Sequence, residues 1–116
     1  MTLTREEILA TSPGRELDSM IADKVIGMDL VEDTLLQLPR YYLPEYDRTI
    51  HRDVPLYSSD IAAAWEIVNN NKRWFSLQWN GMEFICEIGI DSPCRIGAKE
   101  APEAICKCAL LAVLNL

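Results

Sequence analysis

The C-terminal segment, residues 101–116, constrains the fold most, because apolar side chains surround nearly the whole helix that it predicts. Pro102 suits the first turn of that helix, where a missing N–H costs no hydrogen bond. Its predicted buried face comprises Ile105, Cys108, Ala109, Leu111 and Ala112. The opposite side carries little polarity beyond Lys107 and Asn115, whereas a surface helix normally has a broad polar face. We therefore expect this helix to be covered on more than one side.

Length and charge bound the rest of the interpretation. With 116 residues, 49% hydrophobic, the chain is the size of one domain, residues 1–116. A net charge of −7 argues against a basic nucleic-acid footprint, so we expect no direct sequence-specific nucleic acid binding. We expect no membrane partner, because the chain lacks an apolar run of spanning length. Charges occupy the first ten residues, where a signal peptide is apolar, so a cytoplasmic location is expected.

Three more helical segments are expected. Residues 4–10 form a short helical turn, and the apolar residues of 15–26 recur at steps of three and four. Gly27 is placed to end that second helix in a left-handed conformation. The third begins after Ser58 or Ser59, either of which can cap it. Its apolar stripe comprises Ile61, Ala64, Trp65 and Val68, with Trp65 expected in the core.

Alternating side chains predict an antiparallel meander. Residues 74–79 and 82–89 are its first two strands, joined at Asn80-Gly81 by a type I′ turn. Residues 94–99 form the third strand. The order of elements therefore favours an α+β fold in which helices pack one small antiparallel sheet.

The four cysteines, Cys86, Cys94, Cys106 and Cys108, do not suggest a metal site. Cys106 and Cys108 are two residues apart on a helix, a rotation of about 200°, so their thiols face apart. Tetrahedral zinc needs four convergent ligands. We expect no metal and no cofactor, and free cysteines that behave as small buried hydrophobes.

No catalytic residues are predicted. A Ser-His-Asp set could be assembled from Ser58 or Ser59, His51 and Asp60, but no G-x-S-x-G motif supports it and the serines are explained as caps. Paired carboxylates such as Glu83 and Glu87 fit a solvated surface.

An irregular segment, about residues 32–57, is the candidate binding loop. Within it, residues 40–52 hold three of the four tyrosines, three arginines and the only histidine, in an otherwise acidic chain. Tyrosine rings stack on bases and guanidinium groups bind phosphate. The predicted ligand-binding residues are Arg40, Tyr41, Tyr42, Tyr46, Arg48, His51, Arg52, Trp74 and Arg95.

Two alternatives remain open for this loop. The tyrosines could instead anchor it on the core, with its arginines paired to Glu45, Asp47 and Asp53. A protein-binding surface would use the same residue types, because tyrosine and arginine are typical of binding hot spots.

Several helix motifs together resemble the phage ABA sandwich domain family. They are the segments 4–8, 14–18, 21–27, 57–66, 101–106 and 109–114. The resemblance covers most of the chain except about residues 32–54. It implies a three-layer α/β/α sandwich around an antiparallel sheet and carries over no catalytic residues.

A phage setting leads to three functional hypotheses. The first is a non-enzymatic anti-defence protein, in the cytoplasm of the bacterial host, that sequesters a small anionic cyclic-nucleotide-type signal. The second is a protein-binding inhibitor of a host defence or CRISPR effector, and the third is a small nucleotide-processing enzyme. The apolar C-terminal helix also predicts a homo-oligomer.

Overall fold

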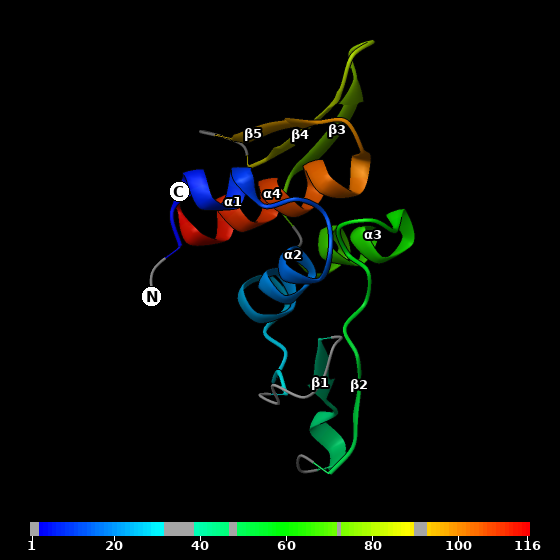
Figure 1. Cartoon of the computed structure of the whole chain (residues 1–116). Coiled ribbons are helices and arrows are strands. Elements are labelled where there is room, and N and C mark those ends of the chain that lie inside the picture. Colours follow the sequence, from blue (N-terminus) through cyan, green and yellow to red (C-terminus); the bar gives the residue numbers. More distant parts are fainter. Residues whose placement is uncertain (1–2, 32–38, 47–48, 72, 90–92) are drawn as a thin grey trace.

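The computed structural model describes residues 3–31, 39–46, 49–71, 73–89 and 93–116 (Figure 1). Its helices are α1 (Arg5–Ala10), α2 (Arg15–Met20), the π-helix η1 (Ile21–Ile26), the 3-10 helix η2 (Pro44–Tyr46), α3 (Ile61–Asn71) and α4 (Ala101–Leu114). Its strands are β1 (Arg40–Tyr42), β2 (His51–Asp53), β3 (Phe75–Trp79), β4 (Phe84–Ile88) and β5 (Cys94–Ala98).

Helix α4 lies at the centre of the molecule, as its all-round apolar surface predicts. Every residue from Ala104 to Leu111 is buried. Strands β4 and β5 cover one side of α4, while η1 and α3 cover another. Helix α1 packs alongside α4 (Figure 1). The helix is therefore covered on more than one side, and the prediction is confirmed.

The two neighbouring cysteines of α4 face different layers. The Cys108 sulfur lies 3.0 Å from the Cys94 carbonyl oxygen and 3.4 Å from that of Cys86, so it points at the sheet. Burial raises the pKa of the Cys106 thiol, and the Asp18 carboxylate of α2 adds to that shift. The opposed directions expected of these thiols are confirmed.

The α+β class is confirmed. Strands β3, β4 and β5 form an antiparallel sheet in that order, and β1 and β2 form a separate two-stranded sheet. Three layers are present: the β3–β5 sheet, α4 with α1, and then α2, η1 and α3 (Figure 1). Within the described residues the α4 layer, rather than the sheet, lies between the other two. None of the described helices is long and apolar enough to cross a membrane.

The turn between β3 and β4 differs by one residue from the prediction. The Asn80 N–H donates to the Glu83 carbonyl oxygen at 3.2 Å, so Gly81 and Met82 are the central turn residues. Gly81 has a φ of 95°, whereas Met82 is not among the residues with positive φ. That pattern fits a type II′ turn, because type I′ needs positive φ at both positions. The Asn80 side chain fixes the shift by accepting from the N–H groups of Met82 and Glu83, each at 2.9 Å.

The expected serine cap of α3 is also wrong. Asp60 caps this helix, since its Oδ1 accepts from the Ala62 N–H at 3.0 Å. Ser58 is buried and serves a different contact: its hydroxyl and its backbone N–H both donate to Asp18 Oδ1, at 2.6 and 2.7 Å. The Gly14 N–H in turn donates to the Ser58 hydroxyl at 2.8 Å. This buried network ties the start of α2 to the chain that enters α3.

The inward face of α3 is rotated relative to the predicted stripe. Ala63, Ala64 and Ile67 are buried, whereas Ile61 and Trp65 are each 48% exposed. Trp65 packs edge-on against Phe75, with 5.7 Å between ring centroids, and so covers the edge of the sheet instead of entering the core. The small alanines allow α3 and α4 to approach closely, and a tryptophan at this contact would hold them apart.

The Asp18 network gives a first prediction. Asp18→Ala leaves the buried N–H and hydroxyl of Ser58 without their acceptor, so we expect the free energy of unfolding to fall by about 3 kcal/mol. Asp23→Ala is the matched control, because Asp23 forms a surface pair with Lys24 that contributes at most about 1 kcal/mol. Urea unfolding measures the free energy of unfolding of both variants. Equal losses of stability in the two variants would contradict the role given to Asp18.

Tyr57 gives a prediction at alkaline pH. Burial raises the pKa of its phenol from 10.0 to about 12, and the Glu66 carboxylate adds to the shift. The unfolded phenol ionises first, so the stability that this group contributes is complete below pH 10 and is lost as pH rises towards about 12. Urea unfolding at about pH 9 and about pH 11 should show a smaller alkaline loss for Tyr57→Phe than for the wild type. Identical losses in the two proteins would contradict this account.

Candidate functional site

The candidate binding loop contains a short hairpin that extends from the helical layers (Figure 1). Strand β1 pairs with β2, and Leu30 bridges to Tyr41 from the other side. The Tyr42 N–H donates to the Asp29 carbonyl oxygen at 2.8 Å, and the Val31 N–H donates to that of Arg40 at 2.9 Å. Strand β1 is therefore held between β2 and the chain that leaves η1.

A cavity of about 670 Å³ lies where η1 meets the hairpin, and we call it the tyrosine pocket. It is lined by Ile26, Gly27, Met28, Asp29, Tyr41, Tyr42, Leu43 and Pro44. Gly27, with a φ of 83°, ends η1 as predicted and turns the chain, so that residues 28–29 form one wall. Most of these lining residues are apolar, and the others include two tyrosines and one aspartate.

Arg40 is held rigidly on the hairpin next to this pocket. Its Nη1 donates to Asp53 Oδ1 at 2.6 Å, and its Nε and Nη2 donate to Nδ1 and the carbonyl oxygen of His51 at 2.5 and 3.0 Å. The His51 ring meets Tyr42 edge-on, with 6.0 Å between centroids. The alternative in which arginine pairs with Asp53 is therefore confirmed for Arg40.

The hairpin brings together part of the predicted set. Tyr41 and Tyr42 line the pocket, while Arg40 and His51 contact each other beside it. Tyr41 also packs against the hydrophobic core, so the loop-anchoring alternative holds for that ring. Arg52 is exposed on β2, opposite Tyr41 in the register.

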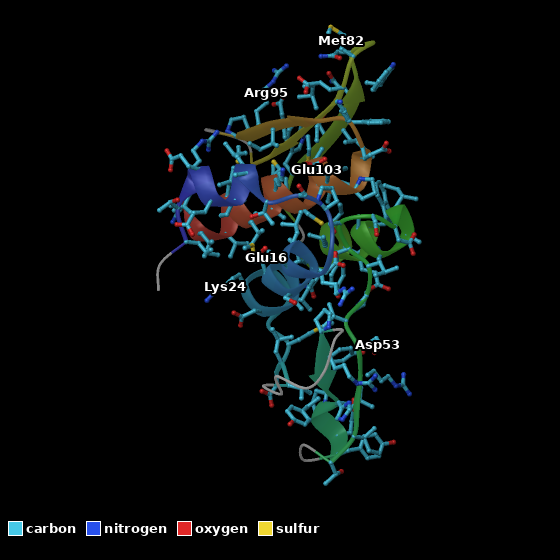
Figure 2. All side chains as sticks on the ribbon, viewed as in Figure 1. Glu16, Lys24, Asp53, Met82, Arg95 and Glu103 are labelled. Carbon is cyan, nitrogen blue, oxygen red and sulfur yellow. The ribbon has the colours of Figure 1, made fainter. Side chains whose placement is uncertain are left out.

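The remaining predicted residues lie elsewhere. Tyr46 is on η2, half exposed and outside the pocket lining. Trp74 precedes β3, and Arg95 is on β5, where Nη1 lies 3.3 Å from Glu87 Oε1. Figure 2 shows Arg95 on the sheet and Asp53 on the hairpin, on opposite sides of the helical layers. Arg48 lies outside the described residues.

Sequence reasoning missed the wall formed by residues 26–29. The sequence signal for this wall was Gly27, which ends a helix and predicts that the chain turns there. A helix-ending glycine does not predict which residues pack against the turned chain. Reasoning also missed Arg5 and Arg73, which line a second cavity together with Arg95. Those three arginines are far apart in the sequence, so no local pattern groups them.

Comparison with known proteins places the chain in a family. The phage ABA sandwich domain model matches residues 19–110. The structure is similar to the crystal structure of a phage protein from Bacillus cereus ATCC 14579, at 25% sequence identity and a TM-score of 0.74. The match covers 90% of this chain and 94% of the other. No curated protein shows significant similarity.

The family match spans most of the chain, and the likeness of fold extends over 90% of it. The family match and the similar structure agree with the family that the helix motifs resemble. The chain belongs to the phage ABA sandwich domain family.

Proposed function

We propose that this phage protein acts against host defence by binding and sequestering a small cyclic-nucleotide-type signal in the tyrosine pocket. The observation that carries the proposal is the pocket itself, a cavity of about 670 Å³ lined by two adjacent tyrosines. Small-molecule sites are commonly concave, largely apolar and about 300–1,000 Å³ in volume. The pocket has the size and the lining of such a site.

The charges around the pocket suit the two ends of a nucleotide. Arg40 keeps two of its five N–H groups outside the contacts with His51 and Asp53, and Arg52 is exposed on the next strand. Either guanidinium would contact a phosphate at the rim. A carboxylate at Asp29 would repel phosphate and would accept hydrogen bonds from the amino group of a base. The proposed orientation therefore places the base near Asp29 and the phosphate towards β2.

We propose binding without turnover. Among the described lining residues only Asp29 carries a carboxylate, so these residues offer no pair of carboxylates for acid–base hydrolysis. A protein that sequesters a signal needs a high affinity and slow release, which apolar and stacking contacts supply.

Calorimetric titration with a panel of cyclic mono-, di- and trinucleotides tests this proposal. At least one member should bind the wild type, and Tyr42→Ala should weaken that binding by about tenfold or more, because stacking on a tyrosine contributes about 1–3 kcal/mol. Tyr46→Ala is the matched control, since this half-exposed tyrosine lies outside the pocket lining. Absence of heat from every member, or equal effects of the two variants, would contradict the proposal.

The second candidate is a protein-binding inhibitor, favoured by an exposed apolar surface on α3. Ile61 and Trp65 lie one turn apart and are each 48% exposed. Large aromatic side chains are typical anchors of protein interfaces. This candidate predicts a stable protein partner in host lysate.

Pull-down at moderate salt distinguishes this second candidate. Trp65→Ala should abolish capture of the partner, while Met82→Ala should retain it, because Met82 is 84% exposed at the distant tip of the β3–β4 hairpin (Figure 2). Capture that survives both substitutions would argue against the α3 surface. Thermal unfolding of each variant verifies that it is folded.

A further inference from the structure

Three arginines from three separate segments converge on one cavity, which we call the arginine pocket. Arg5 comes from α1, Arg73 from the chain before β3, and Arg95 from β5. The cavity has a volume of about 400 Å³ and lies beside the C-terminal end of α4. In a chain with a net charge of −7, this is a marked local concentration of positive charge.

The side chains described in the lining do little to neutralise that charge. No Asp or Glu is among them. Glu87, which lies outside the lining, contacts Arg95 at 3.3 Å. Cys94 does line the pocket, but a hydrogen bond with Cys108 and burial raise the pKa of its thiol, so it stays uncharged. Among the described residues, neither Arg5 nor Arg73 is therefore paired with a side-chain carboxylate.

Contacts with α4 and with Leu116 position two of the arginines without using up their donors. Arg5 Nη1 donates to the Leu116 main-chain oxygen at 3.3 Å, and Arg73 Nη1 donates to the Ala112 carbonyl oxygen at 3.4 Å. Each guanidinium carries five N–H groups. The C-terminal end of a helix carries only about half a negative charge, which offsets a fraction of three positive charges. Donors and charge thus both remain for a ligand.

We propose that the arginine pocket binds the phosphate group of a small phosphorylated molecule. Planar guanidinium groups bind phosphate through paired hydrogen bonds, and a cluster of them selects phosphate over a single-charged anion. A cavity of about 400 Å³ admits a phosphate with a small substituent. The acidic balance of the whole chain would repel a long polyanion. This site goes beyond the tyrosine pocket, with which it shares no lining residue.

Pyrophosphate and inorganic phosphate, titrated by calorimetry into protein in phosphate-free buffer, test the proposal. We expect saturable binding that weakens as sodium chloride rises from about 50 mM to about 500 mM. Arg73→Gln and Arg95→Gln should each lower pyrophosphate affinity by about tenfold. Arg15→Gln is the matched control: it removes the same charge from an exposed position on α2, outside the described linings of both pockets, and should leave the affinity unchanged.

An NMR measurement keeps the test independent of whether the variants fold. Pyrophosphate should shift the side-chain Nε–H resonances of Arg5, Arg73 and Arg95 in the wild type and leave that of Arg15 in place. If sulfate and chloride bound as tightly as phosphate does, the proposed preference for phosphate would be overturned. Tighter binding of a single-stranded oligonucleotide than of pyrophosphate would overturn the proposal of a small ligand. A loss of affinity in Arg15→Gln as large as in Arg73→Gln would overturn the proposed location.

Discussion

The burial of α4 is the constraint on which the rest of the structure depends. A helix that is apolar on all sides must lie between other elements, and here β4 and β5 cover one side while η1 and α3 cover another. The single lysine of α4, Lys107, is also buried. Its Nζ lies 2.6 Å from Glu103 Oε2 and 2.9 Å from the Leu9 carbonyl oxygen. The charge is thus paired and also links α1 to α4.

Because α4 occupies the centre, the surfaces suited to ligands lie at its periphery. The tyrosine pocket forms where a hairpin leaves the helical layers, and the arginine pocket forms beside the last turn of α4. The described lining of the tyrosine pocket includes no residue of α4, and that of the arginine pocket includes, from α4, only residues of its last turn. The shared fold of the family therefore says little about what either pocket binds. The ligand of each pocket has to be inferred from the residues that line that pocket.

Features with a local cause were predictable from the sequence, and features set by distant contacts were not. The periodicity of α4, the three strands β3 to β5 and the glycine that ends η1 all have local causes, and these elements are confirmed. Ser58 looked like a helix cap because its partner, Asp18, is 40 residues away. Tyr41 and Tyr42 were found by composition, whereas Arg5 and Arg73 join Arg95 only through the packing of α1 and β5 around α4.

The central claim is that the tyrosine pocket retains a nucleotide signal intact. Its most direct test is mass spectrometry of small molecules released by denaturing protein that was purified from cells with active immune signalling. The account predicts an unmodified cyclic nucleotide, released in about equal amount to the protein, as expected of a single filled site. Release of no nucleotide, or release of a linear product in its place, would contradict the account.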